Sequence, residues 1–453
     1  MESAFCYDAI VVGGGLAGTT VIAELAAGAP RNFTALLVDG GEPGPGSAYA
    51  TPSEHLYMNG SALAMSAVPG DERHLVRWLR NQPDHAKIPR RLFGRYLRER
   101  FYAAVARRPR FHVARAEIVD LLPAPGGGFE AIDDGGNRYR ARAVVLALGN
   151  YPPDDAFLPE ALRHYEGFVG DPWRFDPQGV REDVLVIGSG LTAMDAVALL
   201  ERTAVRRVHV ISRHGLVPAT DGHCVEAPPE APGLRTETPY ALLRTLRRAA
   251  RRHQAAGGDW RDVIEAIREM SASIWASWDL RERRRFLRHV QPYWSIHRYR
   301  VPEKTAEAFA RMERSGRLVR YRGRAVAARK REDGRLDVDV RGNGATQSIA
   351  VETVVNCTGP NGDYARVRHP LVRNAIARGL LRPDPLRLGL DATPEFRVVD
   401  GYGRPHETLF ALGPPLRGLF YETTAVPETR DQAAAIARAL IARDAGAGLE
   451  AVS

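Results

Sequence analysis

A glycine pattern close to the start of the chain constrains its fold more than any other feature. In the stretch YDAIVVGGGLAGTTVIAELAAG, Gly13, Gly15 and Gly18 directly follow an apolar strand and open a helix. At this spacing the first glycine permits a tight turn, the second lets the backbone approach a pyrophosphate, and the third lets the helix pack on the strand. Asp39 ends the next expected strand, where a carboxylate can accept hydrogen bonds from a ribose. The pattern predicts a βαβ unit that binds a dinucleotide, and the alternative is a tight turn without a ligand.

A second unit of the same kind begins in VREDVLVIGSGLTAMDAVALLERTAVRRVHVISRHG. Its fingerprint is the GxGxxA variant, formed by Gly188, Ser189, Gly190 and Ala193. No acid ends the following strand, and Arg213 and His214 stand there instead. An arginine at this point can pair with a 2′-phosphate, which favours NADPH over NADH. The alternative is that Arg213 is a surface residue of a domain that uses either coenzyme.

The two units together predict the organisation of the chain. Two dinucleotide sites imply one tightly held cofactor and one exchanging reductant, because hydride must pass between them, and FAD first with NADPH second is the usual order. We expect an α/β fold of two Rossmann-like dinucleotide-binding domains, with the NADPH domain inserted into the FAD domain. The expected limits are 1–175 for the first part of the FAD domain, 176–355 for the NADPH domain with a helical insert at about 238–315, and 356–453 for the return of the FAD domain.

Charge and cysteine content bear on partners and compartment. The net charge of +9 is a modest excess, so nucleic-acid binding has little support, and the runs RTLRRAARR and RERRRFLRHV are interpreted as solvated helix faces, with anion or membrane contact as the alternative. Cys6, Cys224 and Cys357 lie far apart without a CxxC, which excludes a sequence-adjacent redox pair and fits a reducing compartment. No secretion signal and no long apolar run is present, so we expect a cytoplasmic protein without membrane insertion. The last residues, AGAGLEAVS, are expected to form a loose tail.

Almost the whole chain resembles a known group of flavoproteins. Besides the double fingerprint, VVLALGN with Gly149 and VVNCTGP with Gly359 resemble the glycine-ended strands at which the chain crosses between two domains, with Leu148 in place of a threonine, and ALGPP follows near the C-terminus. These features are similar to the two-dinucleotide-domain flavoproteins, which include class B monooxygenases, N-hydroxylases and disulfide reductases. The segments GSAYATPSEHLYMN, RRLFGRYL, VISRHGLVP, QPYWSIHRYR and ETTAVPETRDQA look like a bacterial FAD/NAD(P)-binding subfamily within that group.

The resemblance implies roles for further residues. Asn59 falls where related monooxygenases place an asparagine near the flavin ring, although it could equally be an ordinary loop residue. Gly413 falls where a strand end approaches the ribityl phosphate, and the helix that begins near Pro427 would point its amides at the pyrimidine end of the flavin. No zinc-ligand spacing, P-loop, GxSxG or HExxH is found, so neither a metal site nor hydrolytic chemistry is expected.

Two further segments bear on the resemblance to the class B monooxygenases and on possible ligand binding. Class B monooxygenases carry FxGxxxHxxx(W/Y) before the second fingerprint, whereas this chain has YEGFVGDPW, with Asp171 where the pattern has a histidine. This departure argues against the Baeyer-Villiger and S-oxygenating branches. Elsewhere Trp294, His297, Arg298 and Arg300 could bind an acidic substrate or the NADPH phosphates, and the simpler interpretation is a tryptophan that anchors a helical insert.

The resemblance therefore implies an oxidoreductase in which NADPH reduces FAD. The leading hypothesis is a monooxygenase that uses O2 to place one oxygen atom on a nitrogen or sulfur of a small polar metabolite, through a flavin C4a-hydroperoxide. The alternative enzyme is an NADPH-dependent reductase without oxygen insertion. A cofactor-sensing protein with negligible turnover is a further alternative, and the oligomeric state stays open.

Overall fold

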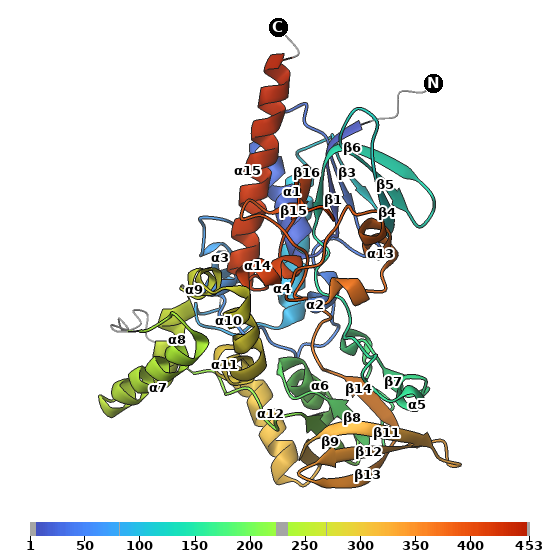
Figure 1. Ribbon diagram of the computed structural model, residues 1–453, viewed down its shortest axis with the longest axis vertical. Coiled ribbons are helices and arrows are strands. Elements are labelled where there is room, and N and C mark those ends of the chain that lie inside the picture. Colours follow the sequence, from blue (N-terminus) through green and yellow to red (C-terminus); the bar gives the residue numbers. More distant parts are fainter. Residues whose placement is uncertain (1–5, 81, 223–233, 269, 451–453) are drawn as a thin grey trace. The chain divides into compact units, whose positions relative to one another are not determined.

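The computed structural model describes residues 6–80, 82–222, 234–268 and 270–450 (Figure 1). The chain divides into two compact units. Unit 1 comprises Met1–Glu54, Gly60–Tyr151 and Gly362–Ser453, and unit 2 comprises His55–Asn59 and Pro152–Asn361. The limits predicted for an FAD and an NADPH domain stay a prediction, because compactness does not show what either unit binds.

Unit 1 is built on a mostly parallel sheet. Its strands are β1 (Cys6–Val12), β2 (Ala35–Val38), β3 (Phe111–Ala114), β4 (Ile118–Pro123), β5 (Phe129–Asp133), β6 (Arg138–Leu146), β15 (Arg397–Val399) and β16 (Pro405–Ala411). They lie in the order β15-β16-β6-β1-β2-β3, and β5 pairs antiparallel with both β4 and β6. The chain order β1, β2, β3 along one direction of the sheet follows from right-handed crossovers through the helices between them.

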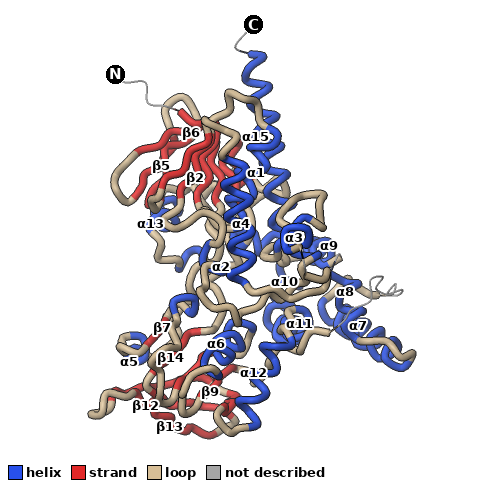
Figure 2. Tube along the Cα trace, turned by 180° about the vertical axis from the view of Figure 1, so that it is seen from behind, coloured by secondary structure: helices blue, strands red, loops and turns tan. Residues whose placement is uncertain are grey.

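Helices cover this sheet on both faces (Figure 2). Because successive strand residues point to opposite sides, Ala9 and Val11 of β1 pack with helices α1 (Leu16–Gly28), α4 (Arg90–Val105) and α15 (Val426–Glu450). Ile10 and Val12 pack on the other side with α13 (Pro370–Ala377). Burial on both faces explains why β1 and β2 are apolar without alternation.

Unit 2 repeats the parallel arrangement with a different order. Its main sheet has the order β10-β9-β8-β14-β7 with parallel pairing, and a separate antiparallel sheet follows it. The strands of the main sheet are β7 (Phe168–Val169), β8 (Val184–Ile187), β9 (Val208–Ser212), β10 (Leu318–Arg322) and β14 (Thr353–Asn356). The antiparallel sheet holds β11 (Arg324–Lys330), β12 (Leu336–Gly342) and β13 (Ala345–Val351). Helix α6 (Leu191–Glu201) forms the crossover from β8 to β9.

A run of helices interrupts unit 2 between β9 and β10. Its elements are α7 (Pro239–Ala255), α8 (Trp260–Arg268), α9 (Ser271–Ser277), α10 (Leu280–Arg285), the π-helical turn η3 (Phe286–Val290), α11 (Gln291–Arg298) and α12 (Glu303–Arg314). The buried Trp275 packs edge-on against Trp278 and Phe286, with ring centroids 6.3 Å and 5.9 Å apart. Aromatic packing of this kind gives the insert a small core of its own.

Short helices join these elements. They are α2 (Gly46–Tyr49), η1 (Leu63–Met65), α3 (His74–Leu79), α5 (Glu160–Arg163), η2 (Pro172–Arg174), η4 (Tyr364–Arg366), η5 (Pro414–Leu416) and α14 (Arg417–Phe420).

The predicted α/β fold with two Rossmann-like domains and a helical excursion is confirmed. The prediction of a loose tail is wrong for residues 445–450, which continue α15 as far as Glu450. Helix propagation adds one hydrogen bond per residue, so a helix that is already docked over its first turns continues through AGAGLE, although glycine is a weak helix former. No helix within the described ranges is long and apolar enough to cross a membrane.

A buried histidine of unit 2 links β9 to β10 and to the residue that precedes β8. His209 on β9 contacts the Asp183 carboxylate through Nε2 at 2.9 Å and the Tyr321 hydroxyl through Nδ1 at 3.0 Å. Burial lowers the pKa of His209 below its ordinary value, although the Asp183 carboxylate opposes this shift. The folded state therefore favours the neutral imidazole.

We expect this histidine to make the protein sensitive to acid. The pKa is lower in the folded state than in the unfolded state, so the unfolded state binds more protons as the pH falls below about 6.5, and the free energy of unfolding decreases in that window. Thermal unfolding followed from about pH 8 to about pH 5 checks this, with H209Q losing part of the acid slope. Y321F is the control, because it removes a hydrogen bond and keeps the titrating ring. An H209Q slope equal to that of the wild type would contradict the assignment, since the lowered pKa values of His74 and His369 contribute equally to both proteins.

Candidate functional site

In the glycine turn of unit 1, the fold leaves no room for a side chain at two of the glycines and leaves room at the third. Gly13 has a φ of +105°, and a Cβ there would lie 2.3 Å from the carbonyl oxygen of Ala147. A Cβ on Gly18 would lie 1.8 Å from the carbonyl oxygen of Gly13. Gly15, the N-cap of α1, has an ordinary φ of −74°, and the nearest atom to a Cβ there is Gly46 Cα at 3.6 Å. Packing tolerates a side chain at Gly15, so close approach by a ligand is the better reason for glycine.

The turn of unit 2 has the same geometry. Gly188 has a φ of +116°, donates its N–H to the Ile211 carbonyl at 2.8 Å, and leaves no room for a Cβ, which would lie 2.2 Å from the Cys357 carbonyl oxygen. Gly190, the N-cap of α6, has a φ of −79°, and a Cβ there would have no described heavy atom within 4 Å. Ser189 donates its hydroxyl to the Leu216 carbonyl. The space beside Gly190 is therefore open, and the methyl group of an alanine would occupy it.

The Asp39 carboxylate is held at the end of β2 by backbone amides. Oδ2 accepts the Gly14 N–H at 2.6 Å and Oδ1 accepts the Gly41 N–H at 2.7 Å. Gly44 donates its N–H to the Gly14 carbonyl at 2.7 Å and so closes the following loop over the turn. A carboxylate has lone pairs to spare after these bonds, so it can also accept a ribose hydroxyl. The turn, the helix N-terminus and this acid fit the adenosine diphosphate part of FAD.

Arg213 and His214 occupy the matching position in unit 2. Both are exposed and directly follow β9, whose Ile211 is in register with Ile187 at the end of β8. Because β8 and β9 are parallel, Arg213 lies at the same edge of the sheet as the Gly188 turn. The structure thus brings the predicted coenzyme residues of unit 2 to one edge.

The two strands that resemble chain crossings are each followed by a glycine in a backbone conformation that favours glycine. Gly149 follows β6 with a φ of +62°, and Gly359 follows β14 with a φ of +96°. No described heavy atom lies within 4 Å of a Cβ built on either residue, so backbone conformation and not crowding accounts for glycine.

A ring of hydrogen bonds fixes Gly413, and sequence reasoning missed its other members. The Gly413 N–H donates to Gln432 Oε1 at 2.8 Å, Gln432 Nε2 donates to Thr423 Oγ1 at 2.6 Å, and that hydroxyl donates to the Gly413 carbonyl at 3.3 Å. Thr423 and Gln432 are buried, and Pro427 lies in the first turn of α15 between them. The only signal in the sequence is the polar run ETTAVPETRDQ ahead of an apolar helix.

We expect Q432L to weaken FAD binding if Gly413 lies at the ribityl phosphate as the resemblance implies. The leucine leaves the buried Gly413 N–H without its acceptor, which costs about 1–3 kcal/mol, or about five- to 150-fold in affinity. Titration of the FAD-free protein with FAD measures the loss. Q432E is the matched control, because its carboxylate still accepts the Gly413 N–H, and it should lose less. Equal losses in both variants would contradict the role of the ring.

The described cysteines do not form a redox pair. Cys6 is exposed and Cys357 is buried behind the Gly188 turn, and both are free. Burial holds the pKa of the Cys357 thiol well above its ordinary value, so the reactive thiolate is disfavoured. Cys224 lies outside the described residues.

The remaining predicted residues have local partners. Asn59 is exposed and belongs to the short segment His55–Asn59 of unit 2, and its role at the flavin stays a prediction. Trp294 is buried in α11, and the His297 ring packs edge-on against Trp260 at 5.1 Å. Arg300 is buried and pairs with Asp221 at 2.7 Å and Glu265 at 3.3 Å. Arg298 lies over the Tyr299 ring. These contacts favour the anchoring role of the cluster over ligand binding.

The segment that departs from the class B pattern is tied to its own surroundings. Tyr165 donates its hydroxyl to the Glu352 carbonyl at 2.8 Å, and a Cβ on Gly167 would lie 2.2 Å from the same oxygen. Asp171 caps η2 by accepting the Trp173 N–H at 3.1 Å. An aspartate caps a helix where a histidine would not, which gives this departure a structural reason.

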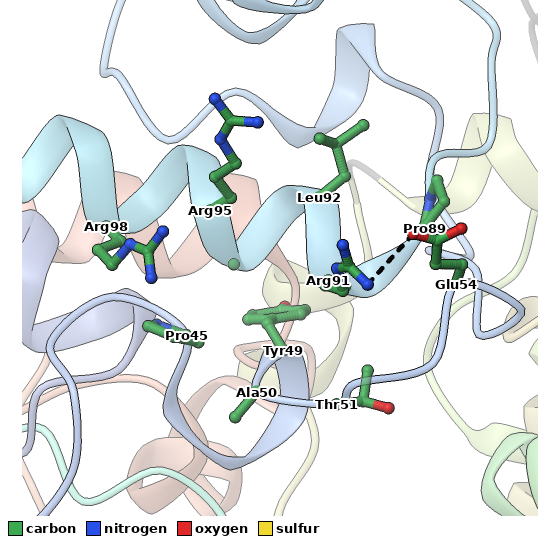
Figure 3. A pocket seen from close by; sticks show the side chains of 11 residues that line it. Pro45, Tyr49, Ala50, Thr51, Glu54, Pro89, Arg91, Leu92, Arg95 and Arg98 are labelled. Carbon is green, nitrogen blue, oxygen red and sulfur yellow. Dashed lines mark ion pairs between the residues drawn. The ribbon is translucent and has the colours of Figure 1, made fainter.

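A cavity of about 490 Å³ lies in unit 1 between α2 and α4 (Figure 3). Arg91 pairs with Glu54 across its mouth at 3.1 Å, and Arg98 extends over Pro45. The Arg98 side chain has no hydrogen bond or ion pair within the described part of the chain. Tyr49 packs edge-on against Phe93 at 4.8 Å, and burial raises the pKa of its hydroxyl, which stays a donor. The size suits a small ligand, and the guanidinium groups suit an anionic one.

Sequence reasoning did not find this cavity, although RRLFGRYLRER places Arg91, Arg95 and Arg98 on neighbouring turns of one helix. Gly94 brings the two walls together, because a Cβ there would lie 2.6 Å from the Tyr49 carbonyl oxygen. That approach of α2 to α4 is a tertiary contact which spacing alone does not indicate.

The N-terminal part of the chain matches a known family. Residues 10–151, which include the first glycine turn, Asp39 and Gly149, match the family model described as FAD-NAD(P)-binding. This segment is an FAD/NAD(P)-binding domain, and the prediction of FAD and NAD(P) as the cofactor class is confirmed at that level. A search of curated protein sequences finds no match.

Solved structures extend the likeness over the whole chain. The L-lysine 6-monooxygenase from Pseudomonas syringae gives a TM-score of 0.64 at 16% identity, covering 96% of this chain and 99% of that chain. The chain has the fold of the two-dinucleotide-domain flavoproteins. The ornithine N-hydroxylase of Kutzneria sp. 744, solved with reduced FAD, NADP+ and L-ornithine, gives 0.63 at 16% identity over 97% of this chain and 100% of that chain. The bacillithiol disulfide reductase from Bacillus cereus gives 0.58 at 15% identity over 97% and 100%. Flavoproteins of this fold thus include both oxygenases and reductases.

Proposed function

We propose that this protein is an FAD-containing, NADPH-dependent monooxygenase that acts on a nitrogen or sulfur of a small polar metabolite. The observation that carries the proposal is the pair of equivalent glycine turns with different second-strand residues. Asp39 follows the first turn and suits a ribose with free hydroxyls, whereas Arg213 follows the second and suits a ribose with a phosphate. One site for FAD and one for NADPH is the arrangement that an external reductant requires.

The residues of the chain bind and orient, and the cofactor supplies the redox chemistry. Bound FAD would accept hydride from NADPH and, once reduced, activate oxygen. The amides at the start of α1, above the open side of Gly15, bind the FAD diphosphate, and Asp39 holds its ribose. The start of α6 at Gly190 binds the NADPH diphosphate, and Arg213 pairs with the 2′-phosphate. The positive N-terminal end of α15 would stabilise negative charge on the pyrimidine part of the flavin, where the resemblance places it.

The cavity between α2 and α4 supports a substrate with an acidic group. Arg98 offers a guanidinium without a partner among the described side chains, and Tyr49, which lines the same cavity, offers a neutral hydroxyl donor. Ornithine and lysine are the substrates named for structurally similar oxygenases, and each combines a carboxylate with a terminal amine. Amino acids with a side-chain amine are therefore the first compounds to test.

A reductase without oxygen insertion is the second candidate, because a disulfide reductase shares the fold. The buried Cys357 and the absence of a CxxC argue against a thiol relay within the chain. Incubation with NADPH, isotopically labelled oxygen gas and a panel of amines and thiols separates the two. Labelled oxygen in a product supports the monooxygenase. Unlabelled products together with NADPH-driven reduction of an added acceptor under anaerobic conditions would favour the reductase.

A further inference from the structure

The basic face of α7 is exposed, and no acid of the described residues pairs with it. We define this face as Arg244, Arg247, Arg248, Arg251 and Arg252 with Tyr240 at its start, and all of these side chains are exposed. The opposite side of α7 is apolar, and Leu242 and Leu246 are buried. Figures 1 and 2 show α8 beside α7 while the far end of the helix has no other element along it.

The arginines of this face lack the partners that other surface arginines have. Arg73, Arg115 and Arg138 each pair with an acid at 2.6–2.7 Å. Within the described ranges, by contrast, no guanidinium group of the α7 basic face forms a hydrogen bond or an ion pair. Neighbours at spacings of three and four residues are also cations, so they repel one another along the helix. This repulsion between like charges destabilises α7. An anionic partner would reduce the repulsion.

We propose that the α7 basic face is a docking site for an acidic surface of another protein. The face extends about 12 Å from Arg244 to Arg252 at 1.5 Å per residue, which matches two turns of a partner helix with acids at the same spacing. A guanidinium group pairs with a carboxylate through two parallel hydrogen bonds. Such pairs would set the position of the partner along α7 as well as balance the positive charge. Tyr240 is 72% exposed at one end, and tyrosine with arginine is the composition typical of protein interfaces.

Other polyanions fit this face less well. A membrane-surface helix buries its apolar side among lipids, but the apolar residues Leu242 and Leu246 of α7 are buried, and α7 packs against α8 and η3 within unit 2. A strip of about 12 Å spans about three or four phosphates of one nucleic-acid strand, fewer than the six to ten contacts that give phosphate-driven binding its strength. The docking site is independent of the proposed function, since α7 carries none of the residues assigned to the cofactors.

The test uses the FAD-loaded full chain and a fluorescent helical peptide with glutamates at positions i, i+3, i+4 and i+7. We expect salt-sensitive binding by the wild type and a loss of at least about tenfold in the R244E/R248E/R251E variant. The matched control, R31E/R107E/R110E, changes net charge equally at exposed arginines of unit 1 and should change affinity less than about twofold. Unchanged FAD content and thermal unfolding show that both variants fold.

Three outcomes overturn the proposal. Equal weakening in the two triple variants means that only net charge matters. Tighter binding to phosphatidylserine vesicles than to the peptide, when lost in the α7 variant, assigns the face to a membrane. The same result with a DNA duplex assigns it to nucleic acid.

Discussion

The G190A variant is expected to fold and to retain FAD while its flavin is reduced by NADPH about a hundredfold more slowly. Gly190 has a φ of −79°, and the space beside it is open in the protein, so the methyl group meets no described atom within 4 Å. A bound diphosphate would occupy that space, and a displacement of about 1 Å can lower the rate about a hundredfold. The measurement is anaerobic reduction of the flavin by NADPH, followed by its absorbance.

The G15A variant provides the reciprocal control. Gly15 has the equivalent position in unit 1, and its Cβ would make only ordinary contact with Gly46 Cα at 3.6 Å. An alanine N-cap costs about 1 kcal/mol in either helix, so the two variants are matched in stability. We expect G15A to be purified with little FAD. If G190A lost FAD instead, or G15A kept it and lost NADPH, the assignment of FAD to unit 1 and NADPH to unit 2 would be wrong.

The R213A variant is expected to lower kcat/KM for NADPH by about ten- to a hundredfold and to leave kcat/KM for NADH nearly unchanged. A hydrogen bond to a charged group contributes about 1.5–3 kcal/mol, and the 2′-phosphate is the only group that distinguishes the two coenzymes. Steady-state kinetics with both coenzymes measure the change. Because Arg213 is exposed and follows β9, its removal should not disturb folding.

R207A is the matched control for long-range charge. Arg207 is also exposed and precedes the same strand, so the two arginines flank β9 at opposite ends, about 20 Å apart at 3.3 Å per residue. Both variants remove one positive charge, and only R213A should change coenzyme preference. A parallel loss with NADH in R213A would mean that Arg213 binds a part common to both coenzymes.

Local chemistry made much of the site predictable. Gly13 and Gly188 were identified because a strand, a tight turn and a helix within a few residues require a positive φ, and both residues have one. Asp39 and Arg213 were identified because the end of a parallel strand in this unit lies at the edge where the turn lies. The end of α15 in AGAGLE was predicted wrongly, since its glycines are typical of a tail and only docking of the preceding turns continues the helix.

The site residues that were not predicted from the sequence depend on contacts between segments that lie far apart in the chain. Gln432 meets Gly413 only because α15 packs behind the end of β16, and Arg91 lines a cavity only because Gly94 lets α2 approach α4. By itself the sequence determined the two dinucleotide turns, their different strand-end charges and the α/β class, because backbone sterics and periodicity act over a few residues. Only the tertiary structure decided which polar groups are buried together, which glycines leave open space and which arginine side chains find no partner among the described residues, since these depend on contacts between segments that periodicity does not relate.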